Sequence, residues 1–84
     1  MNSIRIKILE ELIDNKDTFL EIEELSRISG ISNEILSDHL SKLNDIGIVD
    51  IKKGNIKKYK LNMKDKRVLA LNMIENLEFI RKSS

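Results

Sequence analysis

Three glycines divide the chain into segments whose apolar residues recur with different periods. Before Gly30, and again before Gly47, apolar residues recur every three or four positions, as they do on one face of a helix. A glycine directly after such a stretch is the usual left-handed helix terminator. Beyond Gly47 the period falls to two on both sides of Gly54-Asn55, which is typical of a tight hairpin. The sequence therefore predicts a mainly α-helical fold with a small β-hairpin.

The periodicity predicts four helices and one hairpin, arranged as a single domain over residues 1–84. We expect the helices over about residues 3–15, 22–29, 33–46 and 63–82, a very short extended piece at 18–20, and the hairpin over about 48–61. A chain of 84 residues is short for two domains and buries a marginal core. Because it has no cysteine to form a disulfide or a zinc site, a second subunit is the remaining common route to more burial.

Polar residues at the segment ends predict local geometry. Ser32 or Asn33 can cap the helix of residues 33–46, because a short side-chain oxygen accepts from the free amides of a first turn. Asn62 can cap the last helix, and Asp65 stands where a capping box places an acid. With Gly54 at the first central position, the hairpin is expected to use a type II′ turn.

The helix expected over residues 33–46 has one apolar and one polar face. We expect the apolar face to carry Ile35, Leu36, His39, Leu40, Leu43 and Ile46. The opposite face carries Ser37, Asp38, Ser41 and Lys42, with Glu34 and Asp45. Because His39 lies among leucines, we expect a packed, hydrogen-bonded core histidine and no metal ligand.

The last expected helix is apolar on two sides. A broad face holds Leu69, Ala70, Met73, Ile74, Leu77 and Ile80, and Val68, Leu71 and Phe79 lie roughly opposite. A helix that is apolar on two sides needs two packing partners. We therefore expect a homodimer whose interface contains Ala70, Met73, Ile74, Leu77 and Ile80, with Ile6 of the first helix adding contacts.

The net charge of +1 hides an uneven distribution. Residues 1–51 hold five Lys/Arg and eleven Asp/Glu, whereas residues 52–84 hold ten and three. Five of these basic residues are lysines of the hairpin, between positions 52 and 60. Such asymmetry indicates an anionic partner for the C-terminal half, although a simply solvated surface is the alternative.

The order helix, short strand, helix, tight turn, helix and basic hairpin resembles that of a winged helix-turn-helix. Within it, Ser37-x-His39-Leu40-x-x-Leu43, the exit Gly47-Ile48-Val49 and the closing Tyr59-Lys60-Leu61 look like the ArsR-type branch of winged-helix transcription regulators. The resemblance covers residues 4–61, about two-thirds of the chain. It implies a winged helix-turn-helix that acts as a DNA-binding transcriptional regulator. Together with the doubly apolar last helix, it leads us to expect a homodimer with a C-terminal dimerisation helix.

The same pattern predicts how double-stranded DNA would be bound. A major groove about 12 Å wide admits one helix, which must offer short polar side chains to base edges. We expect Ser37, Ser41 and Lys42 to reach bases, with Ser32 and Asn33 near the backbone at the helix start. The wing lysines Lys52, Lys53, Lys57 and Lys58 are expected to neutralise phosphates.

The acidic character of the same helix leaves a second interpretation open. Glu34, Asp38 and Asp45 share the outward face, and regulators of this type often have a basic residue where Asp38 stands. Asp38 can accept from cytosine N4 or pair with Lys42 one turn later. The alternative is a winged-helix protein-interaction module whose acidic recognition face meets a basic partner.

Several other functions are disfavoured by the sequence. There is no cysteine nucleophile, no glycine-rich phosphate loop and no metal-binding motif, so we expect neither an enzyme nor a metal or cofactor. With one histidine and no cysteine, the metal-sensing clusters found in many ArsR-type proteins are not expected here. No apolar run is long enough to span a membrane, which predicts a cytoplasmic protein.

Overall fold

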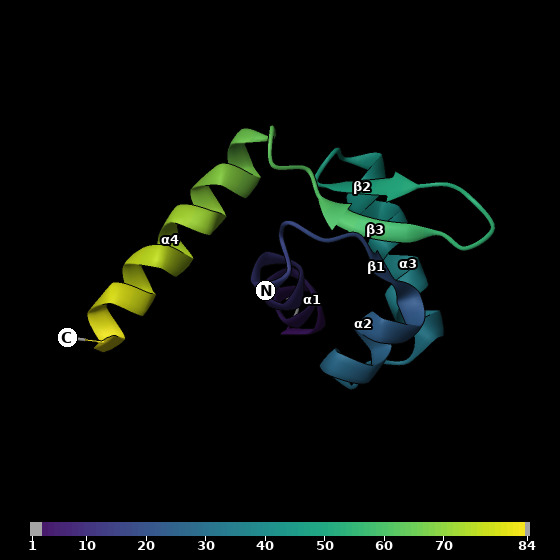
Figure 1. Cartoon of the computed structure of the whole chain (residues 1–84), viewed down its shortest axis with the longest axis horizontal. Helices are drawn as coiled ribbons and strands as arrows, with labels where there is room; N and C mark the ends of the chain where they lie inside the picture. The colour runs from purple at the N-terminus through teal and green to yellow at the C-terminus, as the bar shows by residue number, and fades with distance from the viewer. Residues whose placement is uncertain (1–2, 84) are drawn as a thin grey trace.

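The computed structural model describes residues 3–83, with side chains over residues 3–74. Its elements follow in the order α1 (Ser3–Asp14), β1 (Leu20–Glu21), α2 (Ile22–Ser29), α3 (Asn33–Asp45), β2 (Val49–Lys52), β3 (Lys58–Leu61) and α4 (Lys66–Ser83). Helices α2 and α3 form the helix-turn-helix, and β2 and β3 form the wing beside it (Figure 1). This arrangement confirms the predicted fold class.

The wing belongs to a three-stranded antiparallel sheet with β3 in the middle, in the order β1-β3-β2. Leu20 of β1 lies opposite Tyr59, and Val49 of β2 lies opposite Leu61. These four side chains are buried, because alternate residues of a strand point to the same face of a sheet. The short extended piece between the first two helices is therefore an edge strand that anchors α2 to the wing.

The core lies between this sheet face and the three N-terminal helices. Its buried aliphatic side chains include Ile8, Leu12, Leu25, Leu36, Leu40, Leu43 and Val68. Removing each from water contributes about 1.5–3 kcal/mol. Ile28, Ile35 and Ile46 are exposed, so the inward placement predicted for Ile35 and Ile46 is wrong. Among the described helices, none has both the length and the hydropathy that a membrane span requires.

The helix ends follow the predicted signals in part. Gly30 and Gly47 adopt φ angles of 74° and 81°, the left-handed region in which an added Cβ is strained. The Ser32 hydroxyl accepts from the Ile35 amide, which caps α3. The cap predicted for the last helix is wrong: Asp65 Oδ1 accepts from the Arg67 amide at 2.8 Å. Asn62 instead donates through its side chain to the carbonyl of Gly47, at 3.0 Å.

The connection between β2 and β3 also differs from the prediction. Strand pairing ends at Lys52 opposite Lys58, so residues 53–57 form a five-residue loop. A type II′ turn needs a positive φ at its first central residue, and Gly54 does not have one. The two-residue turn is therefore replaced by a longer tip that carries Lys53 and Lys57.

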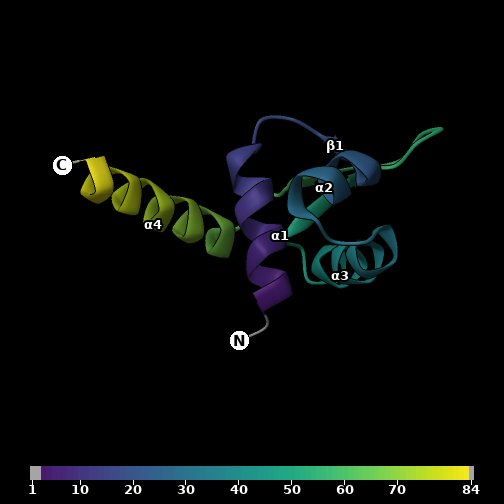
Figure 2. The same cartoon turned by 90° about the horizontal axis from the view of Figure 1, so that it is seen from below.

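Helix α4 leaves the body of the protein at an angle and points away from the wing (Figures 1 and 2). It packs on the core through Val68, which is 1% exposed, and through the half-buried Leu71. Lys16, which follows α1, donates to the Asn72 side chain at 3.4 Å. The contacts described for α4 thus lie in its first two turns.

Candidate nucleic-acid interface

The outward face of α3 brings together the residues of this helix that are predicted to contact DNA. Asn33, Ser37, Ser41 and Lys42 are exposed along it, as is the capping Ser32. On the other side, Leu36, Leu40 and Leu43 are buried against the core. Since the buried side fixes the rotation of the helix, the polar side chains face solvent together.

The same face carries an ion pair between two residues that lie one helical turn apart. Lys42 Nζ lies 3.2 Å from Asp38 Oδ2, and both side chains are more than three-fifths exposed. An exposed pair at this spacing contributes about 0.2–0.5 kcal/mol to helix stability. The pair therefore does little for the fold, and its main effect is to hold a negative oxygen beside a positive nitrogen on the surface.

His39 lies on the opposite side of α3 and is buried, as predicted. Its Nδ1 is 3.5 Å from Nη2 of Arg5 on α1, a residue that no sequence pattern singles out. Within the part of the chain that the structure describes, no three metal-ligating side chains cluster. The contact places His39 at the junction of α1 and α3, away from the outward face.

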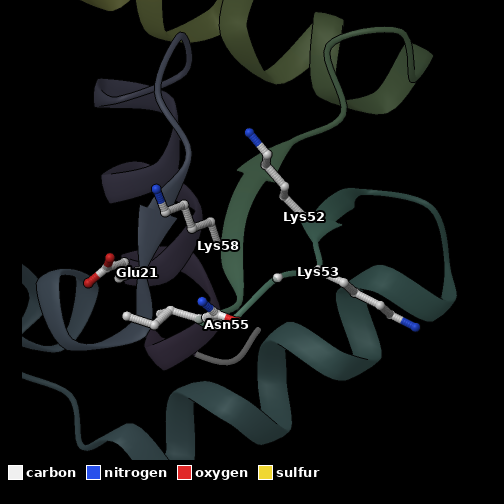
Figure 3. Close-up of a pocket in the computed structure, with 7 residues that line it drawn as sticks. Glu21, Lys52, Lys53, Asn55 and Lys58 are labelled. Carbon is white, nitrogen blue, oxygen red and sulfur yellow. The ribbon is translucent and has the colours of Figure 1, made fainter.

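The wing lysines do not all point the same way. Lys52 and Lys53 project to opposite sides of β2, and Lys58 lies beside Glu21 of β1 (Figure 3). Lys53 and Lys57 are exposed in the loop, and Lys58 is half-buried. The four predicted phosphate contacts are therefore divided between the tip and the outer face of the sheet.

On that outer face, two lysines meet an aromatic ring. The Nζ atoms of Lys60 and Lys52 lie 5.4 and 5.8 Å from the centroid of Phe19, within the range of cation–π attraction. Sequence reasoning missed this cluster. Its signal is the alternation of Phe19 with the inward-facing Leu20, which becomes informative only once Leu20 is known to pair with Tyr59.

The described part of α4 is apolar on its exposed side. Leu69, Met73 and Ile74 are 46%, 63% and 54% exposed, and Ala70 is exposed beside them. Ile6 on α1 is also exposed. Two other residues predicted at the dimer interface, Leu77 and Ile80, lie outside the side chains that the structure describes.

A polar clamp ties the start of α4 to the end of α3. Arg67 Nη2 donates to the main-chain carbonyl of Ile46 at 2.6 Å and to Asp65 Oδ2 at 2.8 Å. The Arg67 side chain, by donating to the Asp65 carboxylate, lowers the pKa of Asp65 to about 2. The orientation of α4 is thus linked directly to the helix that carries the polar face.

Comparison with known proteins gives the context of this geometry. The family model described as bacterial regulatory protein, arsR family, matches residues 2–50. HlyU from Vibrio cholerae is 34% identical, with a TM-score of 0.70, and the match covers 94% of this chain and 79% of that one. No curated protein sequence matches.

Two further solved structures share the fold at lower identity. The AntR antimony-specific transcriptional repressor is 24% identical with a TM-score of 0.75, over 98% of this chain and 70% of that one. A homodimeric winged helix-turn-helix DNA-binding domain from Mycobacterium bovis, a possible ArsR-family regulator, is 21% identical with a TM-score of 0.67. That match covers 90% of this chain and 67% of the other.

Proposed function

This chain belongs to the ArsR family of bacterial regulatory proteins, and we propose that it binds double-stranded DNA sequence-specifically as a homodimer. In this proposal α3 enters the major groove and the wing lies on the flanking backbone. The observation that carries it is the single outward face on which α3 presents Asn33, Ser37, Ser41 and Lys42. The family is one of regulators, and an enzymatic role is not proposed.

The outward face of α3 has the side chains that base edges require. Serine hydroxyls both donate and accept, and lysine donates to guanine O6 and N7. Ser37, Ser41 and Lys42 are the base-contacting residues in this proposal. Ser32 and Asn33 at the helix start meet the backbone, where free amides and the helix dipole favour phosphate.

The wing supplies the sequence-independent part of the affinity. Each phosphate that a lysine neutralises releases condensed counterions, which favours binding at low salt. Lys53 and Lys57 in the loop reach the DNA backbone first. Lys52 and Lys58 lie opposite each other in β2 and β3, where the strands meet the loop. Together they offset the repulsion between DNA and the carboxylates of α3.

The dimer is supported by the exposed apolar side of α4. Leu69, Met73 and Ile74 would each gain about 1.5–3 kcal/mol on full burial. A second copy of α4 with the same face covers them most simply, with Ile6 at the edge. The neighbouring structure from Mycobacterium bovis is described as homodimeric. Two recognition helices in one dimer meet half-sites about 34 Å apart.

A second candidate function rests on the carboxylates of α3. Glu34, Asp38 and Asp45 are exposed on the outward face and repel phosphate. A basic protein partner would suit that charge better than DNA. This interaction module is the alternative to be separated from DNA binding.

The salt dependence of DNA binding separates the two. The full chain is titrated onto fluorescent duplex fragments of genomic DNA at several salt concentrations. A DNA-binding dimer with several phosphate contacts loses affinity steeply as salt rises, with a slope of about −0.9 per contact. Absence of binding at low salt contradicts the proposal and favours the interaction module.

A further inference from the structure

Building on the proposed function, we propose that the Asp38–Lys42 ion pair is a specificity-determining unit that reads a C·G base pair in the major groove. The proposal concerns one position in each half-site. It assigns a positive role to the Asp38 carboxylate on the outward face of α3.

The geometry of the pair suits a base edge. Lys42 Nζ and Asp38 Oδ2 lie 3.2 Å apart on the outward face of α3, with both groups open to solvent. Ser37 and Ser41, beside them on the helix, are short and exposed. A hydrogen-bond acceptor and a hydrogen-bond donor are therefore presented side by side, with room for a base edge to approach both.

A C·G pair offers the complementary pattern of donors and acceptors. Its major-groove edge shows the cytosine N4 amino donor next to the guanine acceptors O6 and N7. The hydrogen bond between N4 and O6 holds those atoms about 2.9 Å apart. This spacing matches that of the ion pair, so the Asp38 carboxylate can accept from N4 while the Lys42 ammonium donates to O6 and N7.

An A·T pair matches the ion pair less well. There the adenine amino group lies between the N7 and O4 acceptors, and a thymine methyl group lies beside O4. An ammonium next to the carboxylate then meets one acceptor in place of two. In the orientation that puts thymine in place of cytosine, the carboxylate instead faces the O4 acceptor and is repelled, which gives discrimination by penalty as well as by attraction.

The negative charge on the outward face of α3 favours a base-reading role for Asp38 over simple exposure to solvent. With Glu34 and Asp45 nearby, a third carboxylate lowers affinity for any phosphate-bearing groove. A hydrogen bond from a cytosine amino group offsets the electrostatic cost of bringing the Asp38 carboxylate into the groove. On other bases the Asp38 carboxylate still lowers the affinity for DNA.

The test selects bound sequences from a pool of randomised 24-base-pair duplexes, with the full chain as bait. Wild type is compared with Asp38→Asn, which keeps the size of the side chain, and with Asp45→Asn, which removes the same charge from the same face. Both sites are exposed, and circular dichroism checks that the helices are retained. Affinities for the selected duplex and its single base-pair variants are then measured.

We expect wild type to select C·G at one position per half-site and to bind the A·T variant about tenfold more weakly. Asp38→Asn should move that preference toward A·T, because an amide pairs bidentately with adenine N6 and N7. Asp45→Asn should strengthen binding to all duplexes without changing the selected base.

Two results would overturn the inference, and they differ in what else they overturn. If wild type binds DNA and Asp38→Asn selects the same bases as Asp45→Asn, the pair does not read sequence, while the proposed function stands. If wild type retains no duplex even at low salt, the proposed function itself fails and the base-reading role fails with it.

Discussion

Arg67 of α4 donates to the main-chain carbonyl of Ile46, just past the end of α3, at 2.6 Å. The two residues are 21 positions apart, and their contact joins the helix with the exposed apolar face to the helix with the exposed polar face. The contact therefore connects the proposed dimer surface with the proposed DNA-binding surface. Asp65, which accepts from Arg67 at 2.8 Å, holds the guanidinium in place.

Removing the Arg67 guanidinium should loosen the start of α4. We expect Arg67→Met to speed amide hydrogen exchange over residues 68–71, because the carbonyl of Ile46 and the Asp65 carboxylate lose their shared donor. Lys66→Met, a neighbouring exposed change of the same charge, is the control. Equal exchange rates in the two variants would show that the clamp does not hold α4.

Acid should weaken the same clamp. The pKa of Asp65 is lowered to about 2 in the folded protein from an ordinary value of 3.8, so its contribution to stability is fully present above about pH 4. That contribution is lost as pH falls through 2. We expect the urea midpoint of wild type to fall more between pH 4 and pH 2 than that of Asp65→Asn. Parallel curves for the two proteins would contradict this assignment.

The lysines in the wing loop should determine how strongly DNA binding depends on salt. Lys53→Ala with Lys57→Ala should weaken binding about equally on all duplexes and flatten the salt slope by about one unit per lost contact. Lys64→Ala with Lys66→Ala removes the same charge from exposed positions outside the wing and serves as the control. An unchanged slope in the loop variant would exclude these two lysines from the phosphate interface.

The polar side chains on the outward face of α3 should determine which DNA sequences are preferred. Ser41→Ala with Lys42→Ala should narrow the difference in affinity between a selected duplex and random DNA, because base-edge contacts discriminate and backbone contacts do not. Competition binding measures both affinities in one experiment. An equal fall in both would mean that these residues position the protein without reading bases.

The assembly prediction concerns the exposed side of α4. Met73→Asp should convert a dimer into a species of 9.7 kDa in sedimentation equilibrium at micromolar concentration, because it buries a charge in the apolar seam. Ile28→Asp places the same charge on an exposed isoleucine of α2 and should leave the dimer intact. A wild-type chain that sediments as a monomer would refute the dimer.

Periodicity and glycine placement predicted most of the helices and strands to within one or two residues. The left-handed Gly30 and Gly47 were predictable because a glycine after a periodic run has few other uses. The start of α4 was placed three residues early, because Asn62 and Asp65 are both good caps and only the fold shows that Asn62 bonds Gly47.

Other features depend on tertiary contacts that periodicity does not contain. Ile35 and Ile46 have helical spacing but lie at the edges of the strip that α3 buries, so both are exposed. The placement of Lys52 and Lys60 around Phe19 follows from the pairing of β1 with β3. The Asp38–Lys42 pair, in contrast, follows from i, i+4 spacing alone and was predictable.

DNA binding through α3 and the wing is tested most directly by mapping the binding surface with amide chemical-shift perturbation in the isotopically labelled full chain. A duplex selected by the wild-type protein is titrated in at low salt. We expect perturbations concentrated in residues 32–42 of the α3 region and residues 52–58 of the wing. Perturbations confined to α4 or to the α1 surface around Ile6, or none at saturating DNA, would contradict binding through α3 and the wing.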